Sequence, residues 1–117
     1  MSFGAASRLH RSAEFKRLQR QGVRCQSPHF VLYAARIDDR GLSRLGVTVS
    51  RRIGNATVRN RVKRRVREWF RLNRSERIPA GVSMVVIARE GAGALDTPAI
   101  NAELMTATLK LGANLAR

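Results

Sequence analysis

The sequence has 117 residues, 44% of them hydrophobic, and a formal net charge of +15. This length fits a single domain over residues 1–117 with one modest core. No apolar run is long enough to span a membrane, no secretory signal is visible near the N-terminus, and a lone cysteine, Cys25, excludes an internal disulfide and a thiolate zinc site. We therefore expect a cytoplasmic protein with a polyanionic partner, with nucleic acid as the first candidate and an anionic membrane surface as the second.

The positive charge is concentrated in one part of the chain. Residues 1–77 hold 20 of the 23 basic residues and 5 of the 8 acidic ones, whereas residues 78–117 are neutral overall. Arginine outnumbers lysine by 20 to 3. Because the planar guanidinium matches phosphate geometry and stacks on bases, this composition favours a nucleic-acid surface over a general solubility role.

The pattern of apolar residues predicts seven elements in the order α-β-β-β-α-β-α. They are a helix over 12–21, strands over 23–26, 30–37 and 44–50, a helix over 56–72, a strand over 82–88 and a helix from 98 to about 116. Ser12, Asn55 and Thr97 are the predicted N-caps of the three helices, and Gly22 is the predicted end of the first helix. The fold class is therefore α+β, a two-layer sandwich of helices on a small central sheet.

The strand over 30–37 is apolar on both of its faces. Phe30 and Leu32 point to one side, and Val31 and Tyr33 point to the other. In a two-layer domain the core covers only one face of the sheet. The second face is then either an exposed groove or a surface covered by another segment.

Two further segments predict how the strands pair. The turn at residues 38–41 has the composition of a hairpin connection, so we expect the strands over 30–37 and 44–50 to be partners. The segment over 82–88 is a nearly continuous β-branched run, which predicts a buried interior strand.

The segment over residues 51–74 contains ten basic residues in 24 positions. A merely solvated helix face usually mixes charges of both signs. Here Lys63, Arg67 and Arg71 repeat like charges at i,i+4, and each such pair destabilises an isolated helix by about 0.2–0.5 kcal/mol. We therefore interpret this face as a phosphate-binding platform with Asn60 as a hydrogen-bonding partner.

The sequence favours RNA over DNA as the bound nucleic acid. The basic helix has no helix-turn-helix partner and no zipper heptads, so the common DNA-binding motifs are not met. Tyr33 on the second face of its strand, with Phe15 nearby, suits single-stranded RNA, whose bases stack on aromatic side chains. The alternative, that both aromatic residues belong to an ordinary core, stays open on the pattern alone.

Catalytic constellations are sparse in this chain. His10 and His29 are the only histidines, and neither has a carboxylate at a helpful spacing. Asp38 and Asp39 could bind a metal ion but stand in a turn, where aspartate is favoured in any case. No Gly-rich phosphate loop is present. We therefore expect no catalytic site and no metal site in the protein itself.

Within the basic helix, Arg59-Asn60-Arg61 is followed by Lys63, Arg64 and Arg67. This spacing resembles the RNR motif of the bacterial ribonuclease P protein subunit. The setting is also similar, with a GVTVSRRIGNA strand-to-helix junction before the motif, an FVLY strand earlier and a VVIAR strand after it. The resemblance covers about residues 8–115. It implies a ribosomal protein S5 domain 2-like fold with a left-handed βαβ crossover around the basic helix.

The resemblance also implies a function. Ribonuclease P removes the 5′ leader of precursor tRNA, and its active site lies in a catalytic RNA subunit that uses Mg²⁺, while the protein subunit binds that RNA and the leader. The residues implied to face the catalytic RNA are Arg51, Arg52, Asn55, Arg59, Asn60, Arg61, Lys63, Arg64, Arg67 and Arg71. Phe15, Val31 and Tyr33 are implied to form the leader-binding cleft, and Gln19 stands where the family often has another cleft aromatic. A monomeric protein, one per RNA and without a membrane partner, is the implied assembly.

Two rival functions remain at this point. A structural or ribosomal-type RNA-binding protein would share the charge but would not need a leader cleft. A stand-alone ribonuclease would cleave RNA without an RNA cofactor, and the two isolated histidines argue against it.

Overall fold

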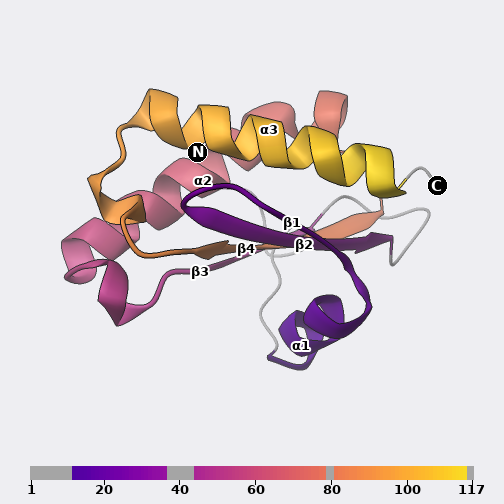
Figure 1. Ribbon diagram of the computed structural model, residues 1–117, viewed down its shortest axis with the longest axis horizontal. Helices are drawn as coiled ribbons and strands as arrows, with labels where there is room; N and C mark the ends of the chain where they lie inside the picture. The colour runs from indigo at the N-terminus through magenta and orange to yellow at the C-terminus, as the bar shows by residue number, and fades with distance from the viewer. Residues whose placement is uncertain (1–11, 37–43, 79–80, 116–117) are drawn as a thin grey trace.

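The computed structural model describes residues 12–36, 44–78 and 81–115, and the predicted order of elements is confirmed (Figure 1). The helices and strands are α1 (Ser12–Gln21), β1 (Val23–Gln26), β2 (Phe30–Arg36), β3 (Arg44–Thr48), α2 (Ala56–Arg77), β4 (Val82–Ala88) and α3 (Thr97–Leu115). Two short 3₁₀ turns, η2 (Arg51–Ile53) and η3 (Ala92–Ala94), precede α2 and α3. Within the described ranges, no helix is both long and apolar enough to cross a membrane.

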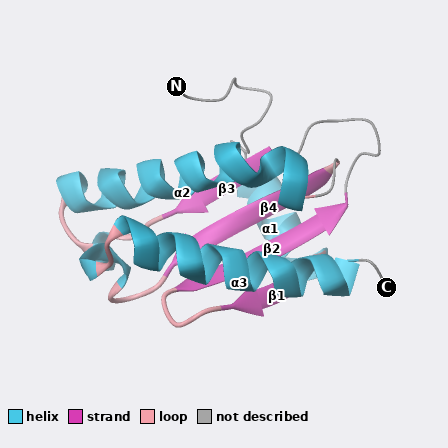
Figure 2. Cartoon of the chain, turned by 90° about the horizontal axis from the view of Figure 1, so that it is seen from above, coloured by secondary structure: helices cyan, strands magenta, loops and turns pink. Residues whose placement is uncertain are grey.

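The four strands form one mixed sheet in the order β1-β2-β4-β3 (Figure 2). The β1–β2 and β2–β4 pairs are antiparallel, and the β3–β4 pair is parallel, with α2 as the crossover between its strands. The prediction of an interior strand over 82–88 is therefore confirmed. The hand of the crossover stays a prediction.

The predicted hairpin between the second and third strands is wrong. β4 lies between β2 and β3 and pairs with both, so these two strands are not partners. The physical reason is burial: six of the seven β4 residues are buried, and an edge position would leave that apolar strand exposed. The turn residues 38–41 lie outside the described part of the chain.

Helices α2 and α3 lie side by side over one face of the sheet, and α1 lies on the opposite face (Figures 1 and 2). The main core fills the space between the sheet and the two long helices. Its fully buried side chains include Phe30, Leu32, Val62, Val66, Phe70, Met84, Ile100 and Leu104. The second face of the sheet carries a smaller cluster under α1, built on Leu18 and Val85.

The predicted start of α2 is confirmed, whereas the predicted end is too early. The Asn55 side chain caps the helix, because its Oδ1 accepts a hydrogen bond from the backbone N–H of Val58 at 3.0 Å. The helix then runs to Arg77, five residues beyond the predicted end at 72, because no glycine or proline interrupts it before residue 79.

The cap of α3 differs from the prediction. Asp96, and not Thr97, accepts the hydrogen bond from the first turn, with 2.9 Å between its Oδ1 and the backbone nitrogen of Ala99. Thr97 is already the first helical residue, so its side chain stands one position too late to cap the helix.

Gly22 ends α1 as predicted. Its backbone N–H donates to the carbonyl of Leu18 at 2.8 Å, and β1 begins at the next residue. A Cβ atom at this position would lie 2.5 Å from the Leu18 oxygen and 2.9 Å from the Ala34 oxygen, so only glycine fits where the chain passes this close to β2.

Candidate RNA-binding surface

The basic residues predicted to bind RNA lie together on η2 and on the outer side of α2. Arg51, Arg52, Asn55, Asn60 and Arg64 are exposed, and Arg59, Arg61, Lys63, Arg67 and Arg71 are half-buried. The opposite side of α2 faces the core through Val62, Val66 and Phe70. The apolar stripe therefore orients the helix and turns its cations outward.

Arg61 is engaged within the protein. Its guanidinium donates a hydrogen bond to the backbone carbonyl of Gly93 in η3, which ties α2 to the segment that leads into α3. The junction is tightly packed, because a Cβ atom on Gly93 would lie 2.7 Å from the Ile53 carbonyl oxygen and 2.8 Å from a methyl group of Val58. Arg61 thus joins α2 to η3, a role that the sequence did not indicate.

Arg71 is paired with the carboxylate that lies one turn before it. Its guanidinium donates to both oxygens of Glu68, with 3.1 Å between Nε and Oε2. The hydrogen bond from Arg71 holds the pKa of the Glu68 carboxyl below its usual value, and Glu68 in turn raises the pKa of Arg71. Arg71 therefore contributes less uncompensated charge to the surface than its position in the sequence suggested.

Other cations on this helix keep unused hydrogen-bonding capacity. The Nε atoms of Arg59 and Arg65 are buried and donate to no group within the described residues. Arg65 was not among the predicted RNA contacts, although it lies in the same basic run. Buried donors without partners are unfavourable in the free protein, so an added acceptor at these sites would stabilise the fold.

The second face of the sheet is only partly covered by α1. Leu18 of α1 is buried against Val85, and the partly buried Tyr33, Ala35 and Ile87 pack around this pair. Strand register places Arg24, Tyr33, Val85 and Gly46 in one row across the sheet, in which Val85 and Gly46 are buried, Tyr33 is half-buried and Arg24 is exposed. The next row, which we call the open row, consists of Gln26, Val31, Ile87 and Thr48.

The three predicted cleft residues differ in how far the structure describes them. Tyr33 and Val31 are both half-buried on the second face, as predicted. Tyr33 packs against the cluster under α1 and keeps part of its ring exposed, so the core and cleft interpretations each describe one part of this side chain. Phe15 falls within α1, but its side chain lies outside the described set.

No carboxylate stands at a helpful spacing from either histidine in the sequence, but the fold brings one from a distant segment to His29. Glu103 of α3 accepts a hydrogen bond from the His29 backbone nitrogen at 2.8 Å, and its second oxygen lies 2.7 Å from the ring Nδ1. The two residues are 74 positions apart, so no local spacing could reveal the pair. Burial raises the pKa of the Glu103 carboxyl, but hydrogen bonds from Ser27 and His29 outweigh this effect and leave the pKa below its usual value.

The pair of His29 and Glu103 acts as a clasp between the β1–β2 turn and α3. The other edge of the imidazole faces Gly91, where a Cβ atom would lie 3.2 Å from Nε2. Within the described ranges, no three His, Cys, Asp or Glu side chains come together as a metal site would require. His10, Asp38 and Asp39 lie outside those ranges.

An arginine-rich helix on one side of a small sheet and a partly open, apolar face on the other side (Figures 1 and 2) are features of a class, the small α+β nucleic-acid-binding proteins. The family model described as Ribonuclease P matches residues 3–112. The chain is 44% identical over 105 residues to the ribonuclease P protein component of Syntrophobacter fumaroxidans, covering 88% of this chain and 86% of that protein. It is 40% identical over 98 residues to the ribonuclease P protein component of Brevibacillus brevis, covering 84% of this chain and 77% of that protein.

Solved structures agree with these sequence relatives. The RNase P protein of Staphylococcus aureus superposes with a TM-score of 0.82 at 33% identity, over 94% of this chain and 98% of that one. The RNase P protein of Thermotoga maritima superposes with a TM-score of 0.78 at 33% identity, over 88% of this chain and 96% of that one. The chain belongs to the family of bacterial ribonuclease P protein components, as the RNR-like motif indicated. It is thus a tRNA-processing protein, a component of the ribonuclease P holoenzyme associated with the RNase P RNA.

Proposed function

We propose that η2 and α2 bind the catalytic RNA of ribonuclease P and that the second face of the sheet binds the 5′ leader of precursor tRNA. The protein then assists removal of the leader, while the RNA subunit and its Mg²⁺ ions hydrolyse the phosphodiester bond. The protein acts as an auxiliary subunit without an active site of its own, in the cytoplasm, as one monomer per RNA.

The observation that carries this proposal is the continuity between the open row and the basic end of the molecule. Thr48 ends β3 in the open row, and the chain passes from there through Ser50 directly into Arg51 and Arg52 of η2. A single strand of RNA lying along the open row would therefore reach the exposed guanidinium groups within a few residues of chain. The leader and the catalytic RNA would meet at this junction.

The chemistry of each part fits its assigned role. Bases stack on aromatic and apolar side chains with little sequence preference, which suits Tyr33 and Val31 and a leader of variable sequence. Guanidinium groups bind phosphates in a bidentate manner and fix position without reading sequence, which suits α2 and a folded RNA partner.

The decisive experiment compares cleavage of precursor tRNA by the purified protein with and without added catalytic RNA. We expect 5′ leader removal only when the catalytic RNA is present and the protein to increase the affinity of the holoenzyme for precursor over mature tRNA. Cleavage by nuclease-free protein alone, lost on His29→Ala substitution, would instead establish a stand-alone ribonuclease. A protein that binds the catalytic RNA but leaves the preference for precursor unchanged would be a structural RNA-binding subunit.

A further inference from the structure

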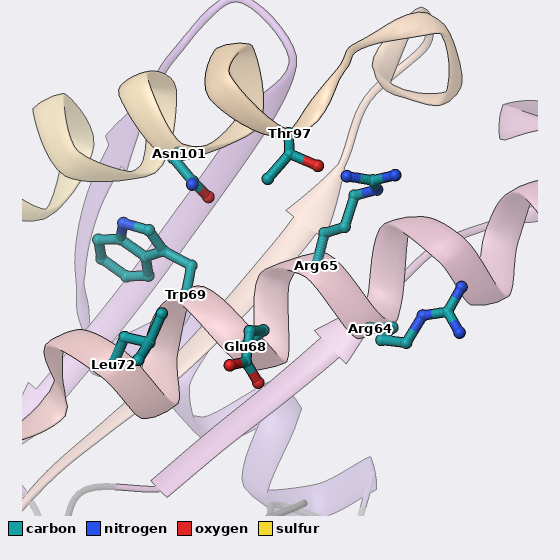
Figure 3. Close-up of a pocket in the computed structure, with 7 residues that line it drawn as sticks. All are labelled: Arg64, Arg65, Glu68, Trp69, Leu72, Thr97 and Asn101. Carbon is teal, nitrogen blue, oxygen red and sulfur yellow. The ribbon is translucent and has the colours of Figure 1, made fainter. Parts of the chain in front are cut away.

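A groove open to solvent lies between α2 and the start of α3, away from the sheet face assigned to the leader (Figure 3). Its volume is about 360 Å³, within the range of small-ligand sites. The residues that line it are Arg64, Arg65, Glu68, Trp69, Leu72, Thr97 and Asn101. Leu72 is 62% exposed at its rim, an unusual position for a large apolar side chain.

Several polar side chains of the groove have no hydrogen-bond partner among the described residues. The Asn101 amide and the Thr97 hydroxyl make no hydrogen bond to another described residue, and the buried Nε of Arg65 has no acceptor. Glu68 differs, because it is already bound by Arg71. The groove therefore presents the guanidinium groups of Arg64 and Arg65, one amide and one hydroxyl beside the apolar side chains of Trp69 and Leu72.

We propose that this groove takes one unpaired nucleotide of the RNA bound by α2, with the base inserted toward Asn101 and the phosphate held by Arg65. This inference rests on the proposed function and names a specific contact within it. An asparagine amide offers a donor and an acceptor side by side, the arrangement that pairs with the N6 and N7 edge of adenine. Unstacked RNA bases expose such edges, and RNA-binding proteins commonly read them in this way.

The phosphate and the base of the nucleotide would lie at two different positions along the groove. Arg65 and Thr97 project toward each other from the two helices, whereas Asn101 and Trp69 face each other one turn further along (Figure 3). The start of α3 is already capped by the Asp96 carboxylate, so the phosphate partner is the Arg65 guanidinium and not the N-terminus of this helix. The apolar contacts for the base come mainly from Leu72, because Trp69 belongs to the core and is only 4% exposed.

Trp69 is the only tryptophan in the chain, so its fluorescence reports on the groove directly. We expect adenosine 5′-monophosphate to change the Trp69 emission in a saturable way, and ribose 5-phosphate, which lacks a base, to leave it unchanged. Asn101→Ala should abolish the response without unfolding the protein, since the side chain is half-buried and makes no hydrogen bond to another described residue. The absence of any saturable response to the nucleotide, or an equal response to ribose 5-phosphate, would refute the base pocket.

The second measurement uses the catalytic RNA. Asn101→Ala should weaken its binding about fivefold to a hundredfold, the range measured for one bidentate base contact, and Arg65→Gln should weaken it as well. The matched controls are Thr106→Ala and Arg36→Gln, exposed residues on α3 and β2 outside the groove, which should bind as the wild type does. If the wild type binds the catalytic RNA and the groove variants bind equally well, the groove inference fails and the proposed function stands. If the wild type does not bind that RNA, the proposed function itself fails.

Discussion

The assignment of the second sheet face to the leader makes Tyr33 the most informative residue to change. Tyr33→Leu keeps an apolar side chain against Leu18 and Val85 but removes the aromatic ring. Stacking of one base on an aromatic side chain contributes about 1–3 kcal/mol. Because Tyr33 is half-buried under α1, only part of its ring is available, and we expect the lower part of this range, about 1–2 kcal/mol. Binding of precursor tRNA to the holoenzyme should then weaken about five- to thirtyfold.

The assay is equilibrium binding of precursor and mature tRNA to holoenzyme assembled with each variant. Tyr33→Leu should weaken the precursor only, because mature tRNA has no leader, and assembly with the catalytic RNA should stay near the wild-type value. Tyr33→Phe is the matched control, since it keeps the ring and removes a hydroxyl that has no hydrogen-bond partner among the described residues. Thermal melting of the free variants checks that the cluster under α1 remains intact.

Two results would refute this reasoning. Equal weakening of precursor and mature tRNA would place Tyr33 outside the leader site. A large fall in the melting temperature of Tyr33→Leu, with the precursor affinity of the folded fraction unchanged, would show that Tyr33 serves the core alone.

Arg64→Ala should make the log–log salt dependence of catalytic-RNA binding shallower by about one unit with no change in melting temperature. Arg61→Ala should instead lower the melting temperature, since it leaves the Gly93 carbonyl without its donor, and equal melting temperatures for the two variants would contradict the structural role of Arg61. Gln19→Phe, at an exposed position of α1, should tighten binding of precursor tRNA several-fold by stacking on a leader base, as measured in the holoenzyme assay, and unchanged affinity would argue against a cleft beside α1. Because the pKa of Glu103 is lowered in the folded state, its stabilisation is present above its ordinary value of 4.5 and is lost as the pH falls through the folded value. Glu103→Gln should therefore lower the melting temperature by about 4–8 °C at pH 7 and by much less at pH 3, and an equal loss at both pH values would exclude the ionic clasp.

The main helix and the interior strand could be predicted because their signals are local. The apolar spacing of Val62, Val66 and Phe70 fixes which side of α2 is buried, and Asn55 marks its first turn. The continuous apolar run of β4 likewise indicates burial on both faces wherever the strand lies in the sheet.

The remaining features depend on contacts between distant segments, and these leave no local signal. The position of β4 between β2 and β3 is decided by which arrangement buries most apolar surface, so the turn composition at residues 38–41 suggested a pairing that does not form. The clasp between His29 and Glu103 and the bond from Arg61 to Gly93 join segments 74 and 32 residues apart. Alternation along the VVIAR segment could have placed Ile87 beside Val31, but only once the strand order was known.

The place of β4 in the sheet also determines when, during synthesis of the chain, the sheet can be completed. β4 is the only strand in the described sheet that joins the β1–β2 pair to β3, and it follows all three of them and the arginine-rich helix in the chain. A nascent chain that has emerged only as far as α2 therefore exposes an arginine-rich helix that has no finished sheet to pack against. Long-range pairing of this kind slows folding and leaves apolar surface exposed while the chain waits for its last strand. During that interval the cationic segment is exposed to cellular polyanions, and the open row has not yet formed.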